Sequence, residues 1–258
     1  MRIFCLIKHV RDTETRIKVV EEGKKIEFIG DNKIISPYDE FAVEEGLKLK
    51  EKFGGEVVAL TVGDEDATKS LRQAMAMGAD SSILVNDPQF YNLDPLSTAK
   101  VIAKALEKEQ FDLILAGKHG VGDDNQAVPS MVAAILGIPV ATVAVALEIE
   151  NNTAKVKREI EGGLEVVSLS LPAVITCQKG LNEPRYPSLK GIMAAKKKEV
   201  KILTNKELSL ESSTFNKGIS FKAYLEPPPR PKGRIIEGEP KEAAKELVKL
   251  LHEEAKVL

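Results

Sequence analysis

Short apolar runs alternate with amphipathic segments along the first half of the chain. Four continuous apolar runs predict buried strands, at residues 3–7, 56–62, 81–85 and 111–116. Helical spacing and helix-start signals predict helices at residues 37–53, 66–77, 95–106 and 126–136. Apolar strands that alternate with helices are typical of a parallel sheet covered on both faces. The pattern therefore predicts a doubly wound α/β fold.

The pattern changes after Val140, where strand-like runs follow one another without helices between them. These runs cover residues 141–150, 154–160 and 164–176. The pairs Asn151-Asn152 and Gly162-Gly163 separate them and favour tight turns. Consecutive strands joined by short turns pair antiparallel, so we expect an antiparallel extension of the sheet.

The C-terminal part differs in composition from the rest. We expect residues 1–198 to form the α/β domain and residues 199–258 to form an extended arm that ends in a helix. The proline-rich run Glu226–Pro231 excludes helix and central strand. Residues 240–252 carry one apolar helix face. The arm either packs back on its own domain or wraps a partner, and both alternatives remain open at this point.

Composition and charge exclude several classes of protein. A net charge of −2 and a pI near 6.1 do not provide the basic face of a nucleic-acid-binding protein. Cys5 and Cys177 each lie in an apolar run, so we expect two buried thiols and a reducing compartment. The first residues lack the features of a secretory signal, and no apolar run has the length of a membrane span. We expect a cytoplasmic protein that does not insert into a membrane.

Candidate catalytic and metal-binding residues are sparse. The three histidines, His9, His119 and His252, lie far apart and lack the spacing of metal ligands. No nucleophile lies in an elbow motif. We therefore predict no catalytic residues and no metal site.

Three loops are candidate ligand sites, because parallel sheets bind ligands beyond the carboxyl ends of their strands. After the fourth strand, Gly117 and two further glycines allow backbone N–H groups to approach a ligand, and the next helix N-terminus favours an anion. The alternative is an ordinary strand–helix turn capped by Asp or Asn, in which Asp123 and Asp124 would help to cap the helix. After the second strand, Gly63 either admits a ribose or adenine or simply forms a turn. Tyr38 either stacks on a flat ligand or fills the core.

The segment that follows the last apolar run has the features of a docking surface. Pro184 and Pro187 stiffen a loop, and Leu189 lies beside a short helix that ends in Lys196, Lys197 and Lys198. An apolar anchor ringed by charges is suited to transient docking. The alternative is that the lysines only complement the helix dipole. A long segment of this kind without catalytic groups favours a partner-binding subunit over a stand-alone enzyme.

Several motifs in order along the chain carry a resemblance to a known family. They are KHVRDT, SPYDEFAVEEGLKLKEK, AMAMGAD, AGKHGVGDD and, above all, REIEGGLE, LPAVIT and GLNEPRYPSLKGIMAAKKK. Together they resemble the β subunit of electron transfer flavoproteins, and the resemblance covers nearly the whole chain. It implies an adenine-nucleotide-binding domain with a partner-recognition loop at residues 182–198, called the recognition loop below.

The resemblance also implies cofactors and partners. It implies a heterodimer with an α subunit that holds most of one FAD and exchanges single electrons with dehydrogenases such as acyl-CoA dehydrogenases. The β subunit then scaffolds the α subunit, carries a structural AMP and has no substrate chemistry of its own. In an electron-bifurcating branch, the β subunit instead binds a second FAD that oxidises NADH. The compartment implied is the cytoplasm of a prokaryote, or the mitochondrial matrix of a eukaryote.

The resemblance assigns roles to individual residues by motif. The nucleotide-binding positions are Leu6, Ser36, Val62, Asp124, Asn125, Gln126, Ala127 and Val128, with Tyr38 near the flavin ring and the glycines Gly63 and Gly117 in the loops. The partner-docking positions are Leu189, which would insert into a dehydrogenase pocket, with Arg185, Tyr186, Ile192, Lys196, Lys197 and Lys198 around it. Glu165 matches an acidic residue that pairs with an arginine of the α subunit.

The chain departs from the family pattern at two places. Ala127, Val128 and Pro129 occupy positions where the family commonly has Gln, then Thr or Val, then Gly, and Pro129 has no N–H to give to a phosphate. Thr13 offers a hydroxyl at a position that approaches the flavin. A stand-alone nucleotide-binding stress protein of similar topology is the alternative from another class, and the long recognition loop and the C-terminal arm argue against it.

Overall fold

The computed structural model of this protein describes residues 1–30, 32–215, 218–230 and 232–258. The chain forms two compact units. The larger unit comprises residues 1–18 and 26–222, and the smaller comprises residues 19–25 and 223–258.

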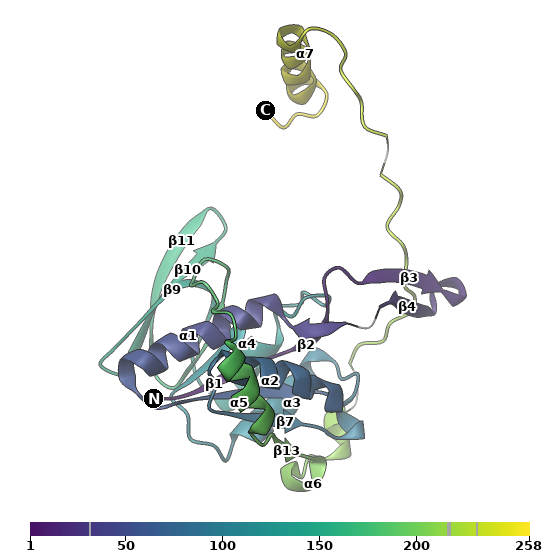
Figure 1. Cartoon of the computed structure of the whole chain (residues 1–258). Coiled ribbons are helices and arrows are strands. Elements are labelled where there is room, and N and C mark those ends of the chain that lie inside the picture. Colours follow the sequence, from purple (N-terminus) through teal and green to yellow (C-terminus); the bar gives the residue numbers. More distant parts are fainter. Residues whose placement is uncertain (31, 216–217, 231) are drawn as a thin grey trace. The chain divides into compact units, whose positions relative to one another are not determined.

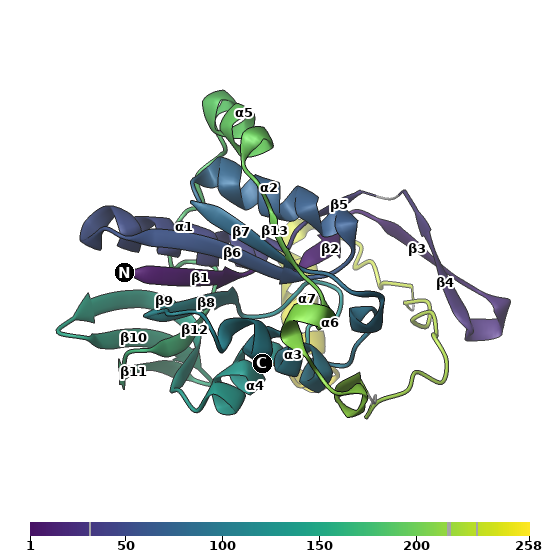
Figure 2. The ribbon, with the colours of Figure 1, turned by 90° about the horizontal axis from the view of Figure 1, so that it is seen from below.

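Within the described residues, the larger unit is built around a sheet of nine strands in the order β11-β10-β9-β12-β8-β1-β6-β7-β13. Figure 1 shows β9, β10 and β11 side by side, and Figure 2 labels all the strands of the sheet. The strands are β1 (Arg2–Leu6), β6 (Glu56–Val62), β7 (Ser81–Val85), β8 (Leu113–Gly117), β9 (Val140–Glu150), β10 (Thr153–Ile160), β11 (Gly163–Ser170), β12 (Ala173–Cys177) and β13 (Lys201–Leu203). Neighbours from β9 to β13 in this order pair in parallel. The carboxyl ends of these strands therefore meet at one edge of the sheet.

Helices cover both faces of the sheet (Figure 2). The helices α1 (Pro37–Phe53) and α2 (Thr68–Met77) lie on one face, and α3 (Pro95–Leu106) and α4 (Val128–Leu136) lie on the other. Alternate residues of β1 divide between the two cores: Ile3 and Cys5 pack with the first pair of helices, and Phe4 and Leu6 with the second. The predicted α/β fold with a mostly parallel sheet is confirmed. No helix of the described residues is long and apolar enough to cross a membrane.

The helix-start signals act as predicted in α3. The Asp94 carboxylate accepts a hydrogen bond from the N–H of Ser97 at 2.8 Å, and Pro95 is in the first turn. By contrast, α2 starts two residues later than predicted, because a 3₁₀ turn, η2 (Glu65–Ala67), precedes it. In that turn, Asp64 accepts from the N–H of Asp66 at 3.1 Å.

The antiparallel extension of the sheet is confirmed for β10, which pairs antiparallel with both β9 and β11. Asn151 and Asn152 form the first turn in the left-handed region, with φ of 46° and 62°. The run 164–176 is not one strand, however. It is interrupted before Ala173, and β12 returns to the parallel part of the sheet, between β9 and β8. Pro172 explains the interruption, because it lacks the N–H that a sheet ladder needs.

Several small elements are not visible in the periodicity of the sequence. They are β2 (His9–Arg11) paired with β5 (Lys33–Ile35), β3 (Arg16–Val20) paired with β4 (Lys25–Ile29), α5 (Leu189–Lys197), α6 (Asn205–Leu208) and the 3₁₀ turns η1 (Glu21–Gly23), η3 (Pro88–Phe90) and η4 (Ser212–Phe215). Of these, only α5 is predicted above. The edge strand β13, which pairs with β7, is also missed. A three-residue strand is too short for alternation to be recognised.

The smaller unit contains the helix α7 (Pro240–Glu253), close to the prediction of 240–252. Residues 226–230 have neither helix nor strand, as their prolines require, and Pro231 of the same run lies outside the described residues. The N–H of Tyr224 donates to the carbonyl of Gly23 at 2.7 Å. The domain boundary between residues 198 and 199 stays a prediction, and the two alternatives for the arm stay open.

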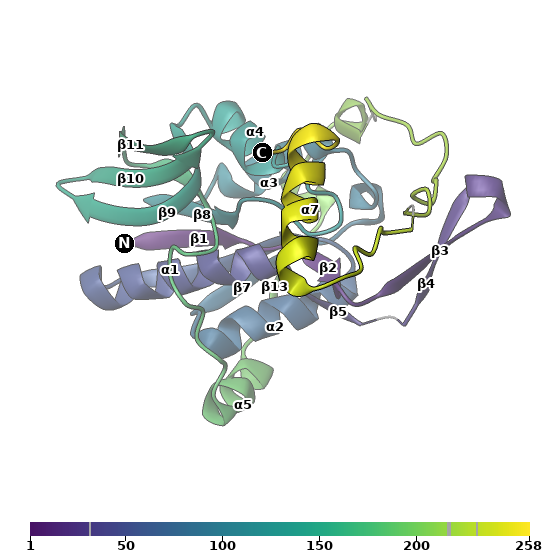
Figure 3. The same ribbon diagram turned by 90° about the horizontal axis from the view of Figure 1, so that it is seen from above.

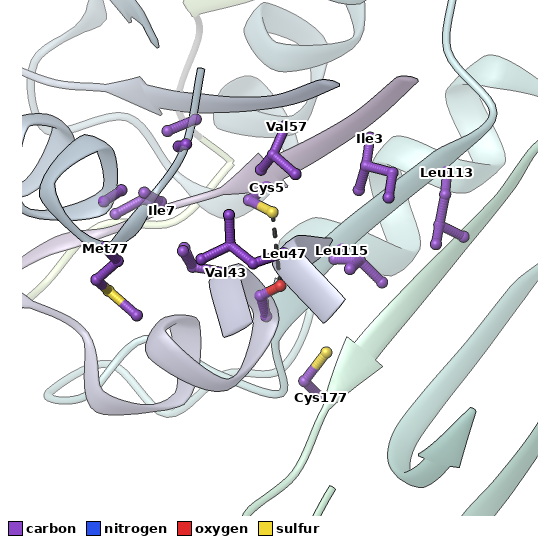
Figure 4. Close-up of a cluster of buried hydrophobic side chains, with 14 of the residues drawn as sticks. Ile3, Cys5, Ile7, Val43, Leu47, Val57, Met77, Leu113, Leu115 and Cys177 are labelled. Atoms are coloured by element: carbon purple, nitrogen blue, oxygen red, sulfur yellow. Dashed lines mark hydrogen bonds between the residues drawn. The ribbon is translucent and has the colours of Figure 1, made fainter. Parts of the chain in front are cut away.

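Both cysteines are free and lie in the core next to α1 (Figure 4). Cys5 and Cys177 are each 0% exposed, and the Cys5 thiol donates to the carbonyl of Ala42 at 3.5 Å. Burial raises the pKa of both thiols well above the ordinary value. The prediction of two buried thiols is therefore confirmed.

We predict that neither thiol reacts with dithionitrobenzoate in the native protein, because a buried thiol with a raised pKa supplies almost no thiolate. Both should titrate after unfolding in guanidinium, and a Ser168→Cys variant, with its new thiol on the exposed edge of β11, should show one reactive thiol without denaturant. A native thiol that reacts as fast as the one in this control would contradict the burial.

Candidate functional site

The loops that follow β1, β6 and β8 lie at one edge of the sheet, because these strands are parallel neighbours. The N-terminus of α1 joins them through its hydrogen bonds to two of these loops. We call this group the loop site. It comprises residues 7–9, 36–39, 63–64 and 117–127.

Asp39 links two of these loops through one carboxylate. It accepts hydrogen bonds from the backbone N–H of Lys8 at 2.7 Å and of Gly117 at 2.8 Å, and it is 4% exposed. Burial raises the pKa of Asp39 to about 7, although the two N–H donors and the Lys8 ammonium act to lower it. A side chain at Gly117 would collide with Asp39 and Tyr38, so this approach of helix to strand requires glycine.

An aromatic pair lies next to this carboxylate. The rings of Tyr38 and His119 meet edge to face, with centroids 4.4 Å apart, and the Lys118 ammonium lies 4.9 Å from the Tyr38 centroid. Within the described residues, the buried His119 Nδ1 has no hydrogen-bond partner. An unpaired buried polar atom is costly, so a ligand that gave His119 Nδ1 a hydrogen-bond partner would relieve this cost.

The two acids of the loop between β8 and α4 do not cap α4, which corrects the capping alternative for Asp123 and Asp124 but not for Asn. Asp123 pairs with the Lys8 ammonium, and the Asp124 carboxylate lies 3.4 Å from His119 Nε2. The residue before α4 is Ala127, whose N–H donates to the Asn125 side chain at 3.1 Å. Both acids are therefore engaged by Lys8 and His119 of the loop site rather than by the start of the helix.

The other predicted nucleotide-binding residues lie in or next to the loop site. The Ser36 hydroxyl donates to the His119 carbonyl at 3.5 Å and accepts from the N–H of Val121 at 3.4 Å. Gly63 donates its N–H to the carbonyl of Val85 at 3.1 Å, which continues the pairing of β6 with β7. The remaining positions are Leu6 and Val62 at the ends of β1 and β6, Gln126 with a φ of 53°, and Val128 as the first residue of α4. Their roles as ligand contacts stay predictions.

Three residues of the loop site, Lys8, Asp39 and His119, were not predicted as site residues from the sequence. Lys8 and His119 lie in motifs that carry the resemblance, and Asp39 directly follows Tyr38. Their positions in or next to these motifs were the sequence signal that could have identified these three residues as part of the site. The pairing of Asp39 with a loop 78 residues away was not visible in any local pattern.

A second cluster resembles a hydrolytic triad in its residue types. His9 lies 2.8 Å from the Ser70 hydroxyl through Nδ1 and 3.1 Å from the Asp66 carboxylate through Nε2. Ser70 is 1% exposed, so its hydroxyl has no access to a substrate. Hydrogen bonds from Lys69 and His9 lower the pKa of Asp66. This cluster ties β2 to α2 and supplies no nucleophile.

The recognition loop presents apolar side chains on the surface. Tyr186 is 96% exposed and Leu189 is 85% exposed, and Ile192 and Met193 follow at 39% and 58%. Leu189 is the first residue of α5 rather than a loop residue, because Ser188 caps the helix by accepting from the N–H of Gly191 at 3.0 Å. We call Tyr186, Leu189, Ile192 and Met193 the apolar patch.

Arg185 does not extend from the surface beside this patch but is tied to α1. Its guanidinium donates to Glu44 at 2.8 and 2.9 Å and to Glu51 at 2.6 Å. These two acids raise the pKa of Arg185. Asn182, at the other end of the same stretch, donates to the carbonyl of Phe41 at 3.0 Å and to Glu45 at 2.9 Å.

The lysine run ends α5, which packs against α2 (Figure 3). Lys196 and Lys197 are exposed, whereas the Lys198 ammonium donates to the carbonyl of Ala79 at 2.7 Å. Arg72 of α2 donates to the Ala195 carbonyl at 2.8 Å and so satisfies the C-terminal end of α5. Lys198 therefore holds α5 in place, and only the first two lysines are available to a partner.

Glu165 is paired within the chain. It lies opposite Arg158 in the β10–β11 ladder and accepts from its guanidinium at 2.8 Å. The Glu165 side chain is 45% exposed. Arg158 is also bound to the carbonyl and hydroxyl of Thr142, at 3.0 and 2.9 Å. The described residues contain no cluster of histidine, cysteine or acidic side chains that could hold a metal ion.

The fold and the loop site define a doubly wound α/β protein with candidate ligand loops at the carboxyl ends of its strands. The family model of the electron transfer flavoprotein domain matches residues 25–208. The chain is 42% identical to the electron transfer flavoprotein subunit beta of Bacillus subtilis, over the full length of both proteins. It is 39% identical to that of Thermoanaerobacterium thermosaccharolyticum, over 98% of each chain, and 38% identical to that of Homo sapiens, over 92% of this chain and 93% of the other.

The chain belongs to the family of electron transfer flavoprotein β subunits. The resemblance noted in the sequence is thereby confirmed. The role that its relatives are named for is electron transfer.

We predict that Asp39 makes the stability of the protein depend on pH. Because the folded chain raises the pKa of Asp39 from 3.8 to about 7, the folded state holds the proton more tightly than the unfolded state does. The free energy of unfolding should therefore fall as the pH rises from about 4 to about 7. The Asp39→Asn variant has no titrating group at this position. Relative to it, the free energy of unfolding of the wild type should fall by roughly 1 to 4 kcal/mol across this window.

Urea unfolding of both proteins at several pH values measures this difference. Ser36→Ala alters the same site without changing an ionisable group, so its stability should follow the wild-type pH dependence. If the free energies of unfolding of the wild type and Asp39→Asn differ by the same amount at every pH from about 4 to about 7, the titration of Asp39 is ruled out.

Proposed function

We propose that the chain is the β subunit of a heterodimeric electron transfer flavoprotein that scaffolds an FAD-bearing α subunit and docks dehydrogenases for single-electron transfer. The observation that carries this proposal is the apolar patch, with Leu189 85% exposed and Lys196 and Lys197 beside it. An exposed apolar anchor next to exposed lysines is suited to transient docking. The anchor inserts into a pocket of the partner, and the lysine charges steer the encounter. Acyl-CoA dehydrogenases are the partner class that the family resemblance suggests. The chain then acts as a carrier component without substrate chemistry.

We further propose that the loop site holds a structural AMP. The residues fit a nucleoside: His119 Nδ1 has no hydrogen-bond partner among the residues that the structure describes, and the half-buried Tyr38 ring lies beside it. Val128 and Ser130 lie in the first turn of α4, where a helix leaves its N–H groups free to bind an anion, whereas Pro129 between them has no N–H. The bound AMP would contribute structure rather than redox chemistry.

The same proposal assigns the contacts with the α subunit. Glu165 is 45% exposed beside its pair with Arg158, so one side of the carboxylate is open to an arginine of the partner. We propose the arm as a second contact, since α7 exposes Leu247 and Val248 at 47% and 56%. The two buried free thiols support a reducing compartment, such as the cytoplasm of a prokaryote or the mitochondrial matrix.

We predict that the native complex releases FAD and AMP in equal amounts when it is denatured with acid. Chromatographic separation and quantification of the released nucleotides measures the ratio. Two FAD and no AMP per heterodimer would contradict the structural AMP and favour the electron-bifurcating alternative, in which this subunit binds a second FAD that oxidises NADH. A single chain that elutes alone on gel filtration and binds ATP would contradict the heterodimer itself.

We predict that Leu189→Ala raises the KM of the complex for an acyl-CoA dehydrogenase by about five- to thirtyfold, because truncation of a central apolar anchor costs roughly 1 to 2 kcal/mol. Steady-state reduction of the complex by the dehydrogenase at varied concentrations measures the KM. Ile202→Ala, on the exposed edge strand β13 at 54% exposure, is the matched control and should leave the KM unchanged. An unaltered KM in Leu189→Ala would remove Leu189 from the docking role.

A further inference from the structure

Arg185 directly precedes the apolar patch and is tied to α1 by hydrogen bonds from both its guanidinium and its backbone N–H. Arg185 donates three guanidinium hydrogen bonds, two to Glu44 and one to Glu51, and its own backbone N–H donates to Glu44 at 3.1 Å. Forked pairs of this kind fix direction as well as distance. The backbone at residue 185 therefore has a defined position relative to α1.

Burial divides this stretch into an inner anchor and an outer surface. The Glu44 side chain is 7% exposed and that of Arg185 is 36% exposed. The next residue, Tyr186, is 96% exposed, and Leu189 is 85% exposed. Glu44 thus lies beneath the loop, where a docked protein would not touch it, and the apolar patch begins one residue after the anchor.

The far end of the patch is held independently on α2. A side chain at Gly191 would collide with the carbonyl of Ala76, so α5 approaches the backbone of α2 closely at this point. Arg72 then binds the carbonyls of Ala195 and Lys196 at 2.8 and 3.2 Å. The residues between these two anchors include Tyr186, Pro187 and Leu189, and of these Tyr186 and Leu189 pack against little of the chain.

We infer that Arg185, together with the buried Glu44, is a positioning pair that sets the orientation of Tyr186 and Leu189 for docking. The inference rests on the proposed docking function and differs from it in assigning Arg185 an intramolecular role rather than a contact with the partner. A loop that is ordered before binding loses less conformational entropy when it docks. Without the pair, only a fraction of molecules would present the patch correctly, and the apparent affinity falls by that fraction.

Three substitutions in the full heterodimer test the pair. Arg185→Gln removes the positive charge of the pair. Glu44→Gln removes its buried negative charge and one of its two acceptor oxygens, at a position that a partner does not reach. Arg185→Lys keeps the positive charge without the forked geometry. Glu51→Gln removes the charge of the exposed second acid, whose side chain is 59% exposed, but keeps an acceptor oxygen for Arg185, and it serves as the control. Retained association with the α subunit and cooperative urea unfolding establish that each variant folds. If Glu44→Gln fails to fold, Arg185→Lys carries the test.

The first readout is hydrogen exchange of the Arg185 amide, which donates directly to Glu44. Arg185→Gln and Glu44→Gln should each accelerate exchange in residues 182–188 by roughly tenfold or more, and the control should not. Unchanged exchange in both variants would overturn the inference. This readout needs no dehydrogenase, so it stands or falls separately from the docking function.

The second readout is the KM for an acyl-CoA dehydrogenase. Arg185→Gln and Glu44→Gln should raise it to a similar degree, about tenfold, with Arg185→Lys between them and the wild type. In a Leu189→Ala background, the added effect of Glu44→Gln should largely vanish, because the anchor that it positions is gone. An effect of Arg185→Gln without one of Glu44→Gln would show that Arg185 contacts the partner and would overturn the inference. If Leu189→Ala itself leaves the KM unchanged, the proposed docking function is wrong. The hydrogen-exchange result still decides whether Arg185 and Glu44 order residues 182–188.

Discussion

Buried carboxylates on α1 position both the loop site and the recognition loop. A buried acid requires hydrogen-bond donors, and here these donors come from distant segments of the chain. Asp39, at the start of the helix, takes the backbone N–H groups of Lys8 and Gly117 and so joins the ends of β1 and β8. Glu44 and Glu45, further along, take Arg185 and Asn182 of the recognition loop. One helix therefore positions the loop site with its first turn and the recognition loop with its middle, and the sheet below it supplies a rigid support.

The fold was predictable where one face of an element is buried over several residues, and it was not predictable elsewhere. The apolar runs of β6 and β7 and the Asp94 cap of α3 define those elements almost to the residue. β12 was merged with β11, since an apolar strand at the centre of a sheet and an exposed one at its edge share the same residue types. β13 was missed because its three residues are held by pairing with β7, an interaction that no local period records.

The candidate site was predictable in location and less so in its internal contacts. The strand–loop–helix order placed the loop site at the carboxyl ends of the strands, and family motifs marked Tyr38 and Leu189. The predicted capping role of Asp123 and Asp124 was wrong, because Lys8 and His119 compete for these acids from other segments. Arg185 was predicted as a docking residue from its place beside Leu189, and its hydrogen bonds to acids 134 to 141 residues away were not predicted. Pairings at such separations follow from the tertiary fold and leave no trace in local spacing.

A small anchored patch is a suitable docking surface for an electron carrier, since the carrier must leave its partner after each transfer. Affinity that comes from a large buried area would slow release, whereas a few apolar side chains with steering lysines give fast encounter and short residence. Such a small surface cannot also supply the free energy needed to order a flexible loop during docking. The Arg185–Glu44 pair and the contact of α5 with α2 supply that order within the folded chain. Under the proposed docking function, the ion pair beneath the recognition loop would thus order the apolar patch before a partner binds, so that weak binding would not have to supply that order.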